Sequence, residues 1–282
     1  MRWIDEGRNK KQLQKSSFNR VRGVVWVCDV INSSKYLNDD DHVDAMEQFL
    51  QRLYEISNLM VGAARGEFIK WTGDGFLAWF ETDLYREINQ KATYALSAAR
   101  QLSLCLDITQ LGISSPTPFK IRHGITYEHD GVSTNITSSN GQKLTDLLGR
   151  NIVLAFRLSG IEADFPRIVS QWEIVNRCSI LVPSVLKFKS LKLRSKEIDK
   201  YFKGEKEGTD SICVTTDLEY DQERISQGTT LMFAENEISI TADILSQMYT
   251  KDQWIRDVAV KYSEAIGEAY MTSARVLFPD GM

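Results

Sequence analysis

The stretch EFIKWTGDGFLAWFE, residues 67–81, decides the fold of this chain. Apolar and aromatic residues lie on both sides of a short polar centre, Thr72-Gly73-Asp74-Gly75. This pattern predicts two antiparallel strands joined by a tight turn, because an Asp-Gly pair supplies the positive φ that a hairpin turn needs. A plain hairpin explains neither Lys70, which lies inside the first predicted strand, nor a function for Asp74 at the tip.

The segments around the hairpin alternate between strand and helix patterns. The apolar, β-branched run VVWVCDV (residues 24–30) predicts a buried strand. Helical spacing of apolar residues predicts helices over residues 42–60 and 84–106. Further along the chain we expect, in order, a strand in FKIRHGITYE (119–128), a polar loop over 132–146, a helix in LLGRNIVLAFRLSG (147–160), mixed pieces around 167–178 and 189–195, and a last strand in DSICVTTDLEY (210–220).

This order predicts an α+β fold, an antiparallel-rich sheet with helices on one face. We expect a basic N-terminal arm over residues 1–22, one main domain over 23–216 and a helical C-terminal extension over 217–282. The aromatic stripe of that extension has helical spacing, which is more typical of core than of a binding face.

The composition excludes several classes of function. The chain has 282 residues, a formal net charge of −4 and a pI of about 5.6, so no global basic field favours nucleic acid or anionic lipid. No apolar run is long enough to span a bilayer, and the polar N-terminus lacks the apolar stretch of a signal peptide. The four cysteines and three histidines have no metal-ligand spacing, so we expect a cytoplasmic protein without disulfides, whose histidines lie on the surface or are satisfied in the core.

Two aspartates point to metal chemistry. Asp29 ends an apolar strand and Asp74 lies at the hairpin tip, so side-by-side strands would bring both carboxylates to one edge of the sheet. Carboxylates that close repel each other unless a cation lies between them, and Mg²⁺ or Mn²⁺ is often held by two carboxylates and substrate phosphates. The alternative is that Asp29 caps the next helix and Asp74 is only a turn residue.

Several motifs together resemble the catalytic domain of class III nucleotidyl cyclases. They are VVWVCDVINSSKYL, EFIKWTGDGFLAWF, FKIRHGITY, DLLGRNIVLAFRLSG and FKGEKEGTDSICV, which stand in the family's order over about residues 24–214. The resemblance implies a ferredoxin-like βαββαβ core. It also implies the cyclisation of a nucleoside triphosphate by attack of the ribose 3′-hydroxyl on the α-phosphate, with pyrophosphate as the leaving group.

The resemblance also implies roles for particular residues. Asp29, Asp74 and the main-chain carbonyl of Val30 would hold two divalent cations, Mg²⁺ or Mn²⁺. Backbone N–H groups around Ser33 and Ser34, at a helix N-terminus, would face the phosphates. Arg157 would neutralise charge at the α-phosphate, and Lys206 would contact the triphosphate. Four of these residues match family positions, namely Ser33, Ser34, Arg157 and Lys206.

One position departs from the family. An asparagine usually stands four residues before the arginine, where this chain has Val153, and Asn151 lies two residues earlier. Asn151 would replace the missing asparagine through a shifted helix, or the ribose would be held in another way. A third reading is a catalytically weakened nucleotide sensor.

The pair Lys70 and Asp146 stands at the family positions that read the base. Lysine as donor and aspartate as acceptor match the amino group and neighbouring ring nitrogen of adenine, and equally those of cytosine. Guanine and uracil present the opposite order and match poorly. The pair therefore favours ATP or CTP.

The arrangement of a short arm, a cyclase-like domain and a compact tail is similar to stand-alone pyrimidine cyclases of bacterial Pycsar antiphage systems. That analogy implies cyclic CMP or cyclic UMP, read by a separate effector protein, with an ordinary adenylate cyclase as the alternative. The family resemblance implies a homodimer with shared sites, in which one chain gives Asp29 and Asp74 and the other gives Lys70, Asp146 and Arg157.

Overall fold

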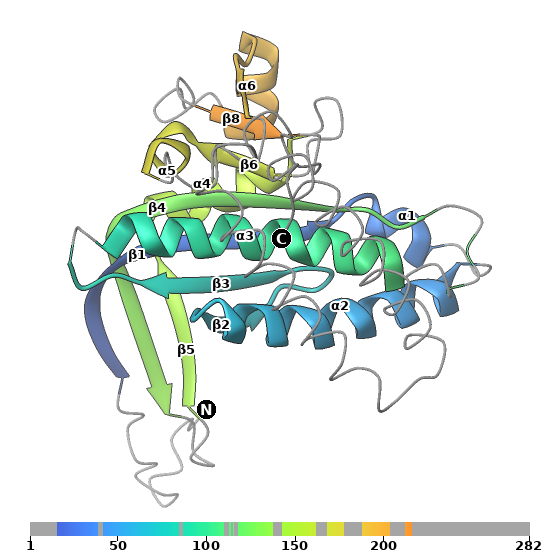
Figure 1. Cartoon of the computed structure of the whole chain (residues 1–282), viewed down its shortest axis with the longest axis horizontal. Coiled ribbons are helices and arrows are strands. Elements are labelled where there is room, and N and C mark those ends of the chain that lie inside the picture. The colour runs from blue at the N-terminus through green and yellow to red at the C-terminus, as the bar shows by residue number, and fades with distance from the viewer. Residues whose placement is uncertain are drawn as a thin grey trace, which may run out of the picture.

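The structure is a computed structural model, and it describes residues 16–38, 42–84, 87–109, 113, 115, 118–137, 143–161, 168–177, 188–203 and 212–215. Helices and strands alternate along this part of the chain (Figure 1). The strands are β1 (Ser16–Val30), β2 (Glu67–Trp71), β3 (Phe76–Glu81), β4 (Ile121–Thr137), β5 (Lys143–Leu148), β6 (Ile168–Gln171), β7 (Lys189–Leu191) and β8 (Ile212–Thr215). The helices are α1 (Ser33–Leu37), α2 (Val43–Ala63), α3 (Ile88–Thr109), α4 (Arg150–Ser159), α5 (Trp172–Arg177) and α6 (Ser195–Phe202).

The strands form one eight-stranded sheet in the order β2-β3-β1-β4-β6-β8-β7, with β5 paired to β4. The long strands β1 and β4 lie antiparallel at its centre, from Val30 opposite Ile121 to Ser16 opposite Ile136. Only the β4–β6 pairing is parallel among the described strands. The predicted α+β fold with an antiparallel-rich sheet is confirmed.

Alternate residues of the central strands face two different cores. Val24, Trp26 and Cys28 of β1 pack with α2 and α3, which lie along one face of the sheet (Figure 1). Val25 and Val27 point to the opposite face, where they pack with Ile152 and Ala155 of α4 and with other residues of β3 and β5. The two longest helices thus share one face, as expected, while α4 covers part of the other.

His123 is a satisfied core histidine. It is fully buried, its Nδ1 accepts a hydrogen bond from Trp26 Nε1 at 3.1 Å, and its Nε2 lies 2.8 Å from Ser103 Oγ. Because Nδ1 is an acceptor, the ring is neutral and Nε2 carries the proton. Cys28, Cys105 and Cys213 are free thiols in the described part of the chain.

Two predicted boundaries are wrong. Residues 16–22, assigned to an N-terminal arm, form the first half of β1. The loop predicted over residues 132–146 is instead the second half of β4 and the start of β5, which pair from Val132–Leu148 to Thr137–Lys143. The polar composition of VSTNIT hid its β-branched residues, which favour an extended strand even on a partly exposed surface.

Residues 217–282 of the predicted C-terminal extension lie outside the described residues. In the part of the chain that is described, no helix is long and apolar enough to cross a membrane.

Candidate active site

The predicted carboxylates come together where the hairpin meets β1. Asp29 is the penultimate residue of β1, and Asp74 lies in the turn between β2 and β3. The pairing of Cys28 with Phe76 places this turn next to Asp29. A Cβ at Gly75 would come within 2.1 Å of the Cys28 carbonyl oxygen, so the backbone of the turn lies directly against β1. Only glycine permits this approach.

The turn differs in one detail from the prediction. The positive φ, 98°, belongs to Gly73 and not to the glycine after Asp74. The Thr72 N–H donates to the Gly75 carbonyl at 2.8 Å and closes the turn. Gly73 is therefore required because it adopts a positive φ, and Gly75 because it has no side chain. A sequence pattern cannot distinguish these two roles of glycine.

The environment of Asp29 disfavours its charged form. The pKa of Asp29 is raised to about 6: burial raises it most, the charge of Asp74 also raises it, and Arg122 lowers it. The two carboxylates are thus close enough to repel each other. A divalent cation between them would relieve this repulsion.

Arg122 is a site residue that the sequence analysis missed. It lies directly opposite Asp29 on β4, with Nη2 3.4 Å from Asp29 Oδ2. Its Nη1 donates to the carbonyls of Gly160 and Ile161 at 3.3 and 3.4 Å, so the side chain joins Asp29 to the end of α4. The signal was present, because alternation in a strand turns Arg122 away from the apolar neighbour Ile121.

The hydrogen bonds of Arg122 leave capacity for an anion. Its side chain is only 8% exposed, its three recorded contacts are all 3.3 Å or longer, and its buried Nε has no hydrogen-bond partner. A buried guanidinium donates five N–H groups and favours shorter, bidentate contacts. It can therefore donate further hydrogen bonds to a strong acceptor, such as a phosphate group beside Asp29.

The residues at this edge fit a hard divalent cation. Asp29, Asp74 and the carbonyl of Val30 supply oxygen atoms only, which is the donor set that Mg²⁺ and Mn²⁺ prefer when phosphate oxygens complete the coordination. The described residues contain no cluster of three or more His, Cys, Asp or Glu side chains that could hold a metal by themselves. A cation held here would thus depend on the substrate for part of its ligands.

Lys70 and Asp146 form an ion pair across 76 residues of sequence. Lys70 Nζ lies 2.6 Å from Asp146 Oδ1, and the side chains are 41% and 45% exposed. The sequence analysis paired these two residues, and the structure brings them together from β2 and β5. The Asp146 carboxylate also accepts from the Leu147 N–H at 2.8 Å, which fixes its orientation.

A β-bulge explains how a lysine fits within this strand. Strict alternation would put Lys70 on the same face as Phe68, against the core under α2. The register shifts between Phe68 and Lys70, so that Ile69 is the extra residue and Lys70 lies opposite Leu77. Trp71 then returns to the face of Phe68 and stacks with it. The bulge keeps both aromatic residues on the core and turns Lys70 to the face of Asp29.

Ser33 and Ser34 follow the metal-binding candidates directly. Asn32 adopts a left-handed conformation with φ of 58°, and its side chain does not cap α1. Ser33 is 9% exposed and Ser34 is exposed. Helix α1 begins at Ser33, three residues after Val30.

Arg157 and Val153 share one face of α4, because they are four residues apart on a helix. Val153 is 50% exposed there. Arg157 Nη1 donates to the carbonyl of Phe202 at 3.5 Å, which links α4 to α6.

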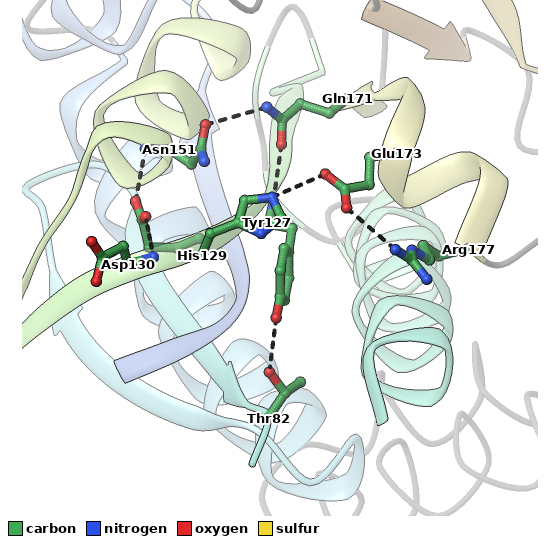
Figure 2. Close-up of polar contacts among 9 residues, drawn as sticks. Thr82, Tyr127, His129, Asp130, Asn151, Gln171, Glu173 and Arg177 are labelled. Carbon is green, nitrogen blue, oxygen red and sulfur yellow. Dashed lines mark hydrogen bonds and ion pairs between the residues drawn. The ribbon is translucent and has the colours of Figure 1, made fainter. Parts of the chain in front are cut away.

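Asn151 lies six residues before Arg157 on α4, so the two side chains point in different directions around the helix. The Asn151 side chain and backbone are held in a polar network (Figure 2). Its N–H donates to Glu128 at 2.8 Å, its carbonyl accepts from Thr126 Oγ1 at 2.7 Å, and its side-chain oxygen accepts from Gln171 Nε2 at 3.3 Å. The structure therefore does not bring Asn151 to the Val153–Arg157 face, as a substitute for the missing asparagine would require.

Glu128 is a second residue that sequence reasoning missed. It is 3% exposed and caps the first turn of α4, whose N-cap residue Gly149 has no side chain to do so. A Cβ at Gly149 would lie 2.2 Å from Glu128 Oε2. The Glu128 carboxylate, which comes from the neighbouring strand β4, takes the place of a local N-cap side chain and fixes the position of α4.

The same view shows a surface cluster on α5. His129 Nε2 lies 3.2 Å from Glu173 Oε2, and Glu173 pairs with Arg177 at 3.7 Å (Figure 2). These residues hold α5 against β4 at a distance from the carboxylates.

Lys206, predicted to contact the triphosphate, lies outside the described residues.

Several solved structures similar to this chain are cyclase domains. The adenylyl cyclase CyaB from P. aeruginosa has a TM-score of 0.55 at 16% identity, over 71% of this chain and 96% of that one. The guanylyl cyclase Cya2 has a TM-score of 0.53 at 13% identity, over 70% and 91%. The catalytic core of a rhodopsin-guanylyl cyclase with converted specificity, in complex with ATPαS, has a TM-score of 0.51 at 15% identity, over 72% and 98%.

No family model matches the sequence, and no curated protein matches it. At identities of 13–16%, the likeness establishes the fold alone. The described chain therefore has the fold of the class III nucleotidyl cyclase catalytic domains.

Proposed function

We propose that this protein is a nucleotidyl cyclase, which converts a nucleoside triphosphate to a 3′,5′-cyclic nucleotide and pyrophosphate. The observation that carries the proposal is the convergence of Asp29, Asp74 and Arg122 at one edge of a cyclase fold. Two coupled carboxylates beside an incompletely bonded guanidinium suit a metal–triphosphate complex better than they suit a structural ion pair.

Each residue has a defined task in this scheme. Asp29, Asp74 and the Val30 carbonyl hold two divalent cations, which when bound supply Lewis-acid activation of the 3′-hydroxyl and charge neutralisation at the phosphates. Asp29 must be deprotonated for this, which its raised pKa makes dependent on pH. Arg122 and the N–H groups around Ser33 and Ser34 orient the β- and γ-phosphates, and Lys206 adds a further contact.

Arg157 acts on the α-phosphate of the site in a partner subunit. Its α4 presents exposed apolar side chains, with Val153 50% and Phe156 37% exposed three residues apart on the helix. Exposed apolar residues on one helix favour an interface between copies of the chain. A homodimer would join Asp29 and Asp74 of one subunit to Lys70, Asp146 and Arg157 of the other.

The base is cytosine or adenine, because the Lys70–Asp146 pair offers a donor beside an acceptor. The analogy with stand-alone pyrimidine cyclases favours CTP and a role in antiphage signalling, in which a separate effector reads the product. ATP is the second candidate, since one neighbour is an adenylyl cyclase and another was solved with ATPαS.

An activity assay tests the proposal. The purified protein is incubated with Mn²⁺ and each of ATP, CTP, GTP and UTP, and the products are identified by mass. We expect cyclic CMP or cyclic AMP from the wild type and none from Asp74→Ala. Asp130→Ala, which removes a carboxylate that is 75% exposed and paired with Arg20, is the matched control and should retain activity. Preference for UTP would overturn the assigned role of the Lys70–Asp146 pair. Triphosphate binding without any cyclic product would indicate a nucleotide sensor instead.

A further inference from the structure

A cavity lies between the C-terminal end of α2 and the middle of α3. Its volume is about 280 Å³, close to the lower end of the range for small-molecule pockets. The apolar side is lined by Met60 and Ala98, which are 1% and 2% exposed. Helices α2 and α3 cover the face of the sheet opposite to α4 (Figure 1). The cavity between them is therefore on the other side of the sheet from Lys70 and Asp29, whose strand registers turn them to the face of α4.

The interior of the cavity also contains polar groups. Ser97 and Gln101 of α3 are 8% and 2% exposed, and Gln101 Nε2 donates to Ser97 Oγ at 2.8 Å. The ring of Tyr94 stands at the mouth, with its hydroxyl bonded to Gln90 Nε2 at 2.9 Å. The cavity thus combines an apolar wall, an aromatic ring and a few convergent polar atoms, as small-molecule sites do.

Arg65 lies at the mouth in a strained conformation. Its φ is 56°, and it occupies the position after the C-cap of α2 in a Schellman arrangement. The Gly66 N–H donates to the Val61 carbonyl at 2.8 Å, and the Arg65 N–H donates to the Gly62 carbonyl at 3.0 Å. Glycine is the usual residue there, because a side chain in the left-handed region costs free energy. A local cost of this kind at a cavity mouth points to a use for the side chain.

The charges around the mouth have one sign. The Arg65 guanidinium is 6.0 Å from the centre of the Tyr94 ring, and Lys91 Nζ donates to the Arg65 carbonyl at 3.3 Å. No acidic residue lines the cavity. Neither cation has a carboxylate partner among the residues that the structure describes. An anion bound at Arg65 would therefore meet one cation of the cavity lining and a second cation, Lys91, held beside the Arg65 backbone.

We propose that this cavity is a binding site for a small aromatic anion, separate from the candidate active site. The ring of the ligand packs on the apolar wall beside Tyr94, and its carboxylate or phosphate accepts hydrogen bonds from Arg65 and Lys91. The site does not depend on the cyclase proposal, because its residues lie on the opposite face of the sheet.

A matched ligand series tests the chemistry of the site. Benzoate, benzamide and acetate are titrated into the full-length wild-type protein, with the methyl NMR signals of Ala63 and Ala98 as the readout at the cavity. Benzoate should shift both signals saturably. Benzamide has the same shape without the charge, and acetate has the charge without the ring. Both should therefore bind at least about tenfold more weakly than benzoate. Equal binding of benzoate and benzamide would contradict the proposal.

The variant Arg65→Gly separates binding from folding. Glycine relieves the positive φ, so this protein should melt at the same or a higher temperature than the wild type while benzoate affinity falls about tenfold. Lys203→Gly is the matched control, since Lys203 is also an exposed cation at a helix C-terminus with φ of 53°. It should gain similar stability and keep benzoate affinity. Unchanged affinity in Arg65→Gly, or an equal loss in both variants, would overturn the proposal whether or not the protein cyclises nucleotides.

Discussion

At the end of β1, the carboxyl group of Asp29 has a second carboxylate and an arginine beside it. Its pKa of about 6, against an ordinary 3.8, means that the folded protein binds a proton here more readily than the unfolded chain does. The unfolding free energy should therefore fall as the pH rises through this window, since the folded state loses a proton that it favours.

The first prediction concerns Asp74→Asn in the metal-free protein. Removal of this charge lowers the pKa of Asp29, because Asp74 is one of the causes that raise it. In the wild type the unfolding free energy should drop by about 1–2 kcal/mol between about pH 4 and about pH 6, after allowance for screening of the exposed third of the side chain. The variant should lose part of that drop. Urea unfolding across this pH range measures it, and an identical profile for both proteins would show that the two carboxylates are not coupled.

A second prediction concerns Val153, which takes the place of the asparagine that the family resemblance implies. It lies one helical turn before Arg157 and is half exposed. Val153→Asn adds an amide donor on the same face, so we expect kcat/KM for cyclisation to rise about tenfold through one new hydrogen bond to the ribose. Phe156→Asn, which places the same amide at another exposed position of α4, is the control, and its kcat/KM should not rise. No gain in Val153→Asn would mean that the ribose is held from elsewhere.

At the scale of elements, the β2–β3 hairpin positions the site by its close packing on β1. A side chain at Gly75 would collide with the Cys28 carbonyl and approach Asp29 Cα to 3.1 Å, whereas a Cβ at Gly73 meets nothing within 4 Å. The two glycines should therefore respond differently to the same substitution.

The third prediction is that Gly75→Ala moves the hairpin away from β1 and separates Asp74 from Asp29. We expect a loss of about 1–3 kcal/mol of stability through overpacking, together with loss of Mn²⁺-dependent activity. Gly73→Ala should cost about 1 kcal/mol through its positive φ and should keep the Mn²⁺ response. Thermal unfolding and Mn²⁺ titration of activity compare the two, and equal Mn²⁺ responses would contradict the argument.

Most elements could be predicted because their signals are local. Helical spacing located α2 and α3, and the apolar run of β1 and the polar centre of the hairpin located the sheet near Asp29. The β4–β5 hairpin was read as a loop, since its pairing depends on residues that lie across the strand rather than next to each other. The bulge at Ile69 also depends on a partner strand. The way in which Lys70 fits inside β2 is therefore visible only in the register of β2 with β3.

The site could be predicted only in part for the same reason. Asp29, Asp74, Lys70 and Asp146 carry recognisable motifs, and the structure brings them together in two pairs. Strand alternation marks Arg122 as a polar-face residue, but its contact with Asp29 is a cross-strand one, and the role of Glu128 comes from a strand–helix contact, so their partners could not be read from the sequence. Asn151 illustrates the converse, because a plausible residue type in the right region faces the wrong way.

At the scale of the whole molecule, the proposed active site requires two chains. Lys70 and Asp29 lie on the side of the sheet that α4 covers, and Val153 and Phe156 of α4 are exposed. A two-fold homodimer would bury this surface and create two equivalent sites, each with residues from both subunits.

The most direct measurement mixes two inactive variants, Asp74→Ala and Arg157→Ala, after dissociation and reassociation. In an equal mixture half of the dimers are mixed, and each mixed dimer has one intact site, so we predict about a quarter of the wild-type cyclisation rate, with the assembly checked by native mass spectrometry. If the mixed dimers form and the mixture stays as inactive as each variant alone, a nucleotidyl cyclase site shared between subunits is ruled out.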